Sequence, residues 1–216
     1  MAEIVPAINV SDFAAVKRLI EISARSAKLV HIDVADGSFT STVTWHNAED
    51  MRGYASPMPI EIHFMVQDPD KKISSWFMPQ VKRIIFHVEA TADPNGIIAK
   101  CHQSNCEAGV AIRPDTSYEK LIPFKDTADL LQVLAVTPGP SGQEFDQNSL
   151  KKIAALRALA PGKIIEVDGG IKPGIARSCA FAGADLIVAG SALFGNGIDF
   201  NKAFLELSDD IKHKDS

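Results

Sequence analysis

Apolar and polar positions along the chain fall into two alternating kinds of segment. Short apolar runs bounded by glycine, proline or polar residues indicate strands, and apolar residues spaced three or four apart indicate helices. We expect strands at 4–9, 28–33, 59–65, 83–87, 107–112, 130–136, 163–167 and 185–189. We expect helices after residue 12, over 46–54, from 68, over 93–104, near 117–121, and over 148–159, 173–181 and 199–211. The pattern therefore predicts a repeated strand–helix unit.

Local signals mark where several of these helices begin. Ser11 or Asp12 can cap the first helix, because a short oxygen-bearing side chain there accepts a hydrogen bond from a free backbone N–H. Pro69 and Pro94 stand at early helix positions, where the missing N–H of proline costs little.

Eight strand–helix units follow one another without a break in composition. This succession is typical of an α/β protein and predicts a single (β/α)8 TIM barrel over residues 1–216, with a polar tail at about 212–216. An open doubly wound sheet is the alternative, but it would need a dinucleotide fingerprint near the first strand. The run Pro6-Ala7-Ile8-Asn9 offers none, so we expect no nucleotide cofactor.

Composition narrows the range of partners. The 216 residues carry a net charge of −5, which argues against nucleic acid or an anionic membrane as the main partner. The first residues do not resemble a signal peptide, and no apolar run approaches the ~20 residues of a membrane helix. The three cysteines are sparse and odd in number, which favours a reducing compartment. We therefore expect a cytoplasmic protein.

Histidine and aspartate recur at the ends of three predicted strands. Alternation puts His31 and Asp33 on one face of the second strand, His63 lies near the end of the third, and Asp168 directly follows the seventh. Local hydrogen bonding would explain any one of them, but four that converge on one barrel mouth favour a divalent cation. The mixed nitrogen and oxygen set favours one Zn, Fe, Mn or Co ion over Ca²⁺. We interpret His87, at the fourth strand, as a supporting residue.

Glycine-rich loops follow the last three strands and indicate a phosphate site. Backbone N–H groups approach an anion closely where glycine leaves the chain uncovered, and many barrels bind phosphate after strands seven and eight. The plain alternative is that these glycines only make tight turns. The candidate phosphate-binding residues are Gly139, Gly142, Gly169, Gly170, Gly190 and Ser191.

These motifs together resemble the ribulose-phosphate 3-epimerase family, over essentially the whole chain. The most specific parts are His31-x-Asp33-x-x-Asp36-Gly37, Ile62-His63-Phe64-Met65-Val66, Phe86-His87-Val88-Glu89-Ala90, Pro138-Gly139-x-x-Gly142-Gln143, Val167-Asp168-Gly169-Gly170-Ile171 and Gly190-Ser191-Ala192. The resemblance implies a barrel of the ribulose-phosphate-binding type, a small phosphorylated ketose as substrate, and a homo-oligomer.

The resemblance also implies a mechanism. His31, Asp33, His63 and Asp168 would bind the metal, and Asp33 and Asp168 would be the catalytic acid/base pair. One carboxylate would remove the proton from C3 of the ketose phosphate, and the other would return a proton to the opposite face of a cis-enediolate. Such chemistry needs a base on each face and a Lewis acid for the enediolate oxygens.

The chain departs from the family pattern in the wall around the substrate. The family usually has Ser at Ala7, an apolar residue at Asn9, and Met at Ala35 and Ala135, so that only Met65 of three lid methionines remains. We expect Asn9 and Met65 to contact the substrate and the two alanines to widen the pocket.

Several functions therefore stay open at this point. The leading one is a 3-epimerase acting on D-ribulose 5-phosphate and D-xylulose 5-phosphate. A 3-epimerase of a larger hexulose 6-phosphate and a sugar-phosphate-binding barrel without turnover are the alternatives. Synthase or decarboxylase chemistry is disfavoured, because those relatives have a lysine in an Asp-x-Lys-x-x-Asp pattern that this chain lacks.

Overall fold

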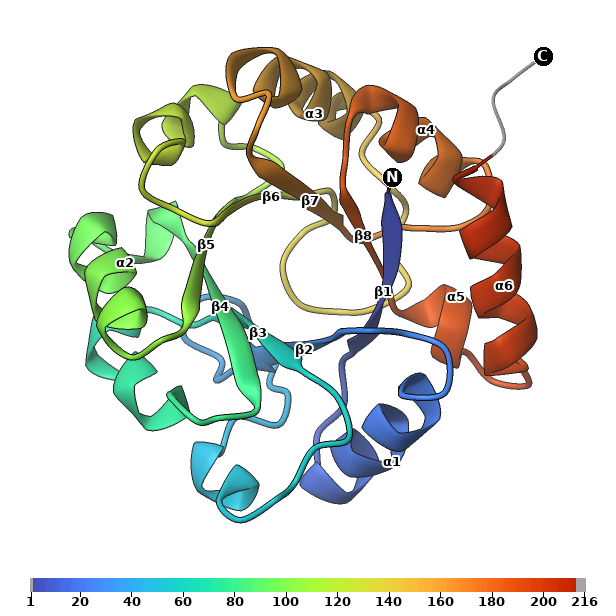
Figure 1. Ribbon diagram of the computed structural model, residues 1–216, viewed down its shortest axis with the longest axis horizontal. Coiled ribbons are helices and arrows are strands. Elements are labelled where there is room, and N and C mark those ends of the chain that lie inside the picture. Colours follow the sequence, from blue (N-terminus) through green and yellow to red (C-terminus); the bar gives the residue numbers. More distant parts are fainter. Residues whose placement is uncertain (1, 213–216) are drawn as a thin grey trace.

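Eight parallel strands close into a barrel in the computed structural model of the chain, which describes residues 2–212 (Figure 1). Each strand pairs with the next one along the chain, and β8 pairs with β1 to close the sheet. The strands are β1 (Glu3–Ile8), β2 (Val30–Ala35), β3 (Ile60–Met65), β4 (Val81–His87), β5 (Glu107–Ile112), β6 (Leu130–Leu134), β7 (Ile164–Asp168) and β8 (Leu186–Ala189). The predicted (β/α)8 TIM barrel is confirmed.

Helices surround this barrel on its outside (Figure 1). They are α1 (Phe13–Ser23), α2 (Pro94–Gln103), α3 (Asn148–Leu159), α4 (Ile175–Ala182), α5 (Ser191–Phe194) and α6 (Phe200–Asp210). Asp12, not Ser11, caps α1, because its Oδ1 accepts a hydrogen bond from the Ala15 N–H at 2.8 Å. The one-turn helix α5, in the loop after β8, was not predicted.

Full helices are absent after β2 and β3 within the described part of the chain, and there the prediction is wrong. The segment 46–54 contains only a 3₁₀ turn, and 3₁₀ turns also stand where helices were expected from 68 and near 117–121. These turns are η1 (Ala48–Met51), η2 (Pro69–Lys71), η3 (Ile73–Trp76) and η5 (Tyr118–Lys120).

Side-chain contacts explain the short turn after β2. Asn47 caps it, and Asp50 accepts a hydrogen bond from Trp45 Nε1 at 2.9 Å, which ties the turn to a buried indole. Trp45 packs edge-to-face on Trp76 at 5.4 Å between ring centroids, and Trp76 packs the same way on Phe64 of β3. Two buried tryptophans therefore cover this side of the sheet, where apolar spacing alone predicted a helix.

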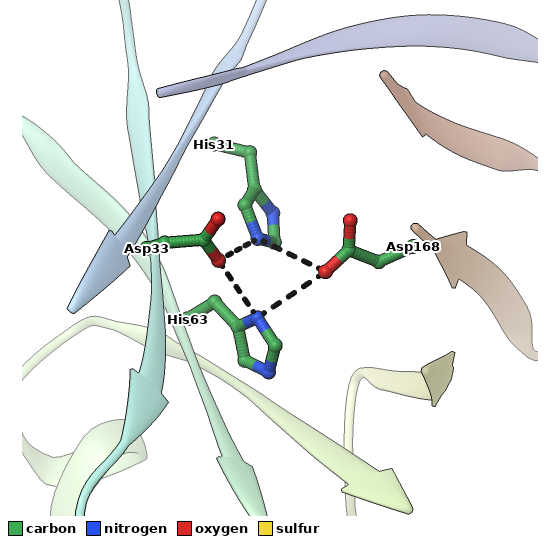
Figure 2. Close-up of side chains that lie close together, drawn as sticks. All are labelled: His31, Asp33, His63 and Asp168. Atoms are coloured by element: carbon green, nitrogen blue, oxygen red, sulfur yellow. Dashed lines mark hydrogen bonds and ion pairs between the residues drawn. The ribbon is translucent and has the colours of Figure 1, made fainter. Parts of the chain in front are cut away.

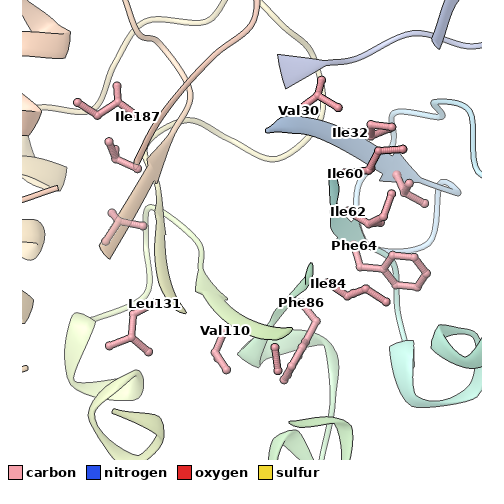
Figure 3. Close-up of a cluster of buried hydrophobic side chains, with 14 of the residues drawn as sticks. Val30, Ile32, Ile60, Ile62, Phe64, Ile84, Phe86, Val110, Leu131 and Ile187 are labelled. Atoms are coloured by element: carbon pink, nitrogen blue, oxygen red, sulfur yellow. The ribbon is translucent and has the colours of Figure 1, made fainter. Parts of the chain in front are cut away.

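Strand alternation separates an apolar outer face from a barrel interior that holds the buried charged residues. The outward side chains pack against the helices and form the main core (Figure 3). Its strand residues include Val30, Ile32, Ile60, Ile62, Phe64, Ile84, Phe86, Val110, Leu131 and Ile187. The interior holds a few apolar side chains, such as Ile85, Ala111 and Leu130, and beside them buried polar residues, which are His31, Asp33, Glu61, His63, Arg83, His87, Gln132, Glu166 and Asp168. The alternation predicted for His31 and Asp33 is confirmed, and it directs the chemistry inward.

The described residues include no helix of the length and apolar character needed to span a membrane. Residues 213–216 of the predicted polar tail lie outside the described part of the chain. The assignment of residues 1–216 to a single domain stays a prediction, although the barrel uses strands from one end of the described chain to the other.

Candidate active site

Four predicted ligand residues meet at the carboxyl end of the barrel interior (Figure 2). Asp33 and His31 come from β2, His63 from β3 and Asp168 from the end of β7. His63 Nδ1 lies 3.1 Å from Asp33 Oδ1 and 3.4 Å from Asp168 Oδ2. His31 Nε2 lies 3.5 Å and 3.9 Å from the same two oxygens. One nitrogen or oxygen of each residue thus falls within 4.8 Å of all the others. We call these four residues the His/Asp cluster.

Burial and polarity of the His/Asp cluster fit a divalent transition metal. Both imidazoles are completely buried, and Asp33 and Asp168 are 8% and 7% exposed. His31 Nε2 has no hydrogen-bond partner among the described residues, although it is buried and faces both carboxylates. An unpartnered buried nitrogen beside two carboxylates is costly unless a cation or a proton compensates. Two imidazole nitrogens and two carboxylates form a donor set that suits Zn, Fe, Mn or Co.

The pKa shifts of His31 and Asp33 also favour positive charge within the His/Asp cluster. Burial lowers the pKa of His31, but the nearby Asp33 carboxylate, the hydrogen bond with Glu61 and the Asp168 charge raise it well above its ordinary value. Burial raises the pKa of Asp33, but His31 and His63 hold it below its ordinary value. Asp33 therefore stays ionised and favours positive charge, from protons or a metal, on the two imidazoles.

His87 stands behind His63, outside the His/Asp cluster. Its Nε2 lies 2.9 Å from His63 Nε2, and its Nδ1 lies 3.4 Å from Glu89 Oε2. Burial lowers the pKa of His87 to about 4, so the ring is neutral near pH 7. When His63 Nδ1 faces Asp33 and Asp168, its Nε2–H donates to His87. His87 thus holds the orientation of His63, which agrees with its interpretation as a supporting residue.

A cavity opens above the His/Asp cluster at the mouth of the barrel, where Asp33 and Asp168 form part of its floor. The loops after β6, β7 and β8 supply most of its wall. Every residue predicted to bind substrate or phosphate lines it, namely Asn9, Met65, Gly139, Gly142, Gly169, Gly170, Gly190 and Ser191.

Packing explains some of these glycines without a ligand. A Cβ on Gly169 would stand 2.4 Å from Val136 Cγ2, and one on Gly170 would stand 2.5 Å from the Phe145 backbone nitrogen. Both glycines also have positive φ, so tight turns account for them. Gly190 differs, because its φ is −103° and the nearest atom to an added Cβ would be 3.5 Å away. The packing around Gly190 would therefore accept a Cβ, so close packing does not explain the glycine, and its backbone is exposed to the cavity.

The structure corrects the predicted pocket wall. Ala35 and Ala135 are completely buried and do not line the cavity, so the prediction that they widen it is wrong. Leu134 and Val136 line it instead. Leu130, Gln132 and Leu134 share the inward parity of β6, and the polar Gln132 was the signal that could have revealed it.

Asn9 has hydrogen bonds within the protein as well as a place in the cavity wall. Its amide nitrogen donates to Asp33 Oδ2 at 2.9 Å and to the Gly139 carbonyl at 3.2 Å. The amide nitrogen therefore already has two acceptors within the protein. Asn9 still lines the cavity, so it joins the carboxylate of the His/Asp cluster to the loop after β6.

Solved structures define the class of fold. A 3-hexulose-6-phosphate synthase from Salmonella typhimurium superposes with a TM-score of 0.75 at 11% identity, over 97% of this chain and 98% of that one. An orotidine 5'-phosphate decarboxylase from Pyrococcus horikoshii superposes with a TM-score of 0.69 at 14% identity, over 98% and 100%. At such low identity these likenesses establish a (β/α)8 barrel and nothing finer.

Sequence comparison then identifies the family. The ribulose-phosphate 3-epimerase family model matches residues 3–194. A ribulose-phosphate 3-epimerase of Bacillus subtilis is 32% identical over 215 residues, which cover 96% of this chain and 98% of the relative. One from Schizosaccharomyces pombe is 31% identical over 198 residues, covering 89% and 87%. The chain belongs to the ribulose-phosphate 3-epimerase family and is an enzyme of the isomerase class, an epimerase.

Proposed function

We propose that the chain is a metal-dependent 3-epimerase that interconverts D-ribulose 5-phosphate and D-xylulose 5-phosphate. The observation that carries the proposal is the His/Asp cluster, in which Asp33 and Asp168 come from β2 and β7 and both border the cavity. Inversion of a carbon next to a carbonyl needs one proton-transferring group on each face, and two carboxylates from separate strands supply them.

His31, Asp33, His63 and Asp168 would hold one divalent ion of Zn, Fe, Mn or Co. When bound, such an ion supplies the positive charge that stabilises an enediolate during proton transfer. His31 and His63 would each present one unprotonated ring nitrogen to the ion, and their other ring nitrogens are hydrogen-bonded to Glu61 and His87. No further cofactor is required, because the reaction moves only a proton.

Asp33 and Asp168 would carry that proton. One oxygen of each faces the imidazoles, at 3.1 Å and 3.4 Å from His63 Nδ1, and both residues also border the cavity. One of the two, as its carboxylate, would take the proton from C3, and the other, as its protonated acid, would deliver a proton to the opposite face, so the pair would end with its two protonation states exchanged. Asn9 donates to Asp33 Oδ2 and would keep that carboxylate in one orientation.

The phosphate of the substrate would lie against the loops after β6, β7 and β8. Gly139, Gly142, Gly169, Gly170, Gly190 and Ser191 would surround it and offer backbone N–H groups. Met65 lines the same cavity and would cover the apolar side of the reacting carbons. The alternative of a larger hexulose phosphate loses its motive, since Ala35 and Ala135 lie outside the wall. The cytoplasmic location and a homo-oligomeric state stay predictions.

A coupled assay for xylulose 5-phosphate tests this function. Metal-loaded protein should convert ribulose 5-phosphate, and Asp33→Asn or Asp168→Asn should lower turnover by roughly 10²–10⁴-fold, the usual contribution of a placed acid or base. Metal content is measured in parallel, because each change also removes a ligand charge. An Asn variant that keeps its metal and near wild-type turnover would show that its carboxylate carries no proton.

A further inference from the structure

Four consecutive strands place charged or titratable residues at one level beneath the cavity. The register pairs His31 with Glu61, Glu61 with Arg83, and Arg83 with Glu107, across β2, β3, β4 and β5. Glu61 is completely buried and Arg83 is 2% exposed. Branched apolar side chains usually fill this part of a (β/α)8 barrel. Burying the Glu61–Arg83 ion pair here costs desolvation free energy, which suggests that the pair has a role other than stability. We call Glu61, Arg83 and Glu107 the relay.

Hydrogen bonds run through the relay without a gap. His31 Nδ1 lies 2.8 Å from Glu61 Oε1, and Arg83 Nη1 donates to Glu61 Oε2 at 2.7 Å. Arg83 Nε donates to Glu107 Oε2 at 2.9 Å, and the Glu107 side chain is 37% exposed. Each oxygen of Glu61 thus faces one donor, and the guanidinium fixes the carboxylate from the side opposite the imidazole.

This arrangement determines which nitrogen of His31 carries the proton. A carboxylate at 2.8 Å from Nδ1 accepts the Nδ1–H, so in the neutral ring, the form that can bind a cation, Nε2 is the nitrogen without a proton. Nε2 is the atom that faces Asp33 Oδ1 and Asp168 Oδ2 and has no hydrogen-bond partner among residues 2–212. The relay therefore presents His31 to the His/Asp cluster in the one tautomer that can bind a cation there.

Glu166 is the competing carboxylate in the same interior. Its Oε1 lies 3.8 Å from His31 Nδ1, beyond hydrogen-bond distance, and accepts instead from Gln132 Nε2 at 2.9 Å. Glu166 and Glu61 are both completely buried and have the same side chain. Glu61 has hydrogen bonds with His31 and Arg83, whereas Glu166 has one with Gln132 and none with His31, so Glu166→Gln controls for the loss of a buried carboxyl group next to the same imidazole.

We propose that Glu61, held by Arg83, is a positioning residue for His31 and sets the affinity of the His/Asp cluster for its metal. The proposal rests on the proposed function, in which His31 is a metal ligand. Changing a partner that orients a metal-binding histidine typically costs 10–100-fold in affinity. Glu61→Gln should have this effect, because a neutral amide has one acceptor oxygen for two donors, His31 Nδ1–H and Arg83 Nη1–H.

The test measures Zn²⁺ affinity of metal-stripped, full-length protein by competition with a chromogenic chelator. We expect Glu61→Gln to weaken binding by about 10–100-fold and Glu166→Gln to leave it near the wild-type value. Co²⁺ absorption gives a second readout, since a misplaced imidazole changes the ligand field and a purely structural role does not. Equal affinities in wild type and Glu61→Gln, or equal losses in both variants, would overturn the proposal.

Two further measurements keep the test decisive. If Glu61→Gln does not fold, the double variant Glu61→Leu, Arg83→Met removes both charges at similar volume, and well-packed apolar replacements of ion pairs are often tolerated. It too should bind Zn²⁺ weakly, because His31 Nδ1–H has lost its acceptor, and wild-type affinity in it would overturn the proposal. Wild-type protein that binds neither Zn²⁺ nor Co²⁺ would instead refute the metal site of the proposed function.

Discussion

Asn9 illustrates how much a single residue determines at this site. Its amide donates both to Asp33 Oδ2 and to the carbonyl of Gly139, so it couples a carboxylate of the His/Asp cluster to the loop after β6. The resemblance to the family suggests an apolar residue at this position. An apolar side chain would leave Asp33 Oδ2 without this donor. Asn9 therefore gives the Asp33 carboxylate of this chain a hydrogen bond that an apolar residue at position 9 could not provide.

Replacing Asn9 with leucine tests that role. Hydrogen bonds to charged groups contribute about 1.5–3 kcal/mol, so Asn9→Leu should lower kcat/KM for ribulose 5-phosphate by roughly tenfold or more. Unchanged kcat/KM in Asn9→Leu would mean that Asp33 keeps its orientation without the amide.

At the scale of elements, alternation in the strands predicted most of the site. Polar residues within apolar strands showed which parity faces inward on β2, β3 and β7, so His31, Asp33, His63 and Asp168 could be named from the sequence. On β6 the prediction failed by one residue, and Leu134 took the place given to Ala135. Contacts between strands were beyond prediction, because the register that puts His31 beside Glu61 belongs to the closed barrel.

The beginning of α1 gives a prediction at this scale. Sequence left Ser11 and Asp12 as alternative caps, and the structure chooses Asp12, whose Oδ1 accepts from Ala15 N–H. Asp12→Ala should lower the free energy of unfolding by about 0.5–2 kcal/mol, the usual value of an N-cap. Chemical denaturation measures the loss, and Ser11→Ala should change little. A larger loss in Ser11→Ala than in Asp12→Ala would contradict this assignment.

At the scale of the whole molecule, barrel closure assembles the site. Asp33 and His63 lie on adjacent strands, but Asp168 comes from β7 and reaches them only because the sheet closes on itself (Figure 2). The same closure gathers the loops after β6, β7 and β8 around one cavity. Helices and buried apolar side chains on the outside supply the stability, which leaves the interior free to hold charged groups.

Hydrogen exchange at C3 tests the central claim, that Asp33 and Asp168 epimerise the substrate by proton transfer at the His/Asp cluster. Ribulose 5-phosphate is incubated with the metal-loaded protein in deuterated water, and the C3 signal is followed by NMR. We predict that xylulose 5-phosphate forms with deuterium from solvent at C3, and that Asp33→Asn and Asp168→Asn each abolish most of this epimerisation. Two results would contradict the account: xylulose 5-phosphate that keeps its original C3 hydrogen when the wild-type protein forms it, or formation of xylulose 5-phosphate at full rate by either variant.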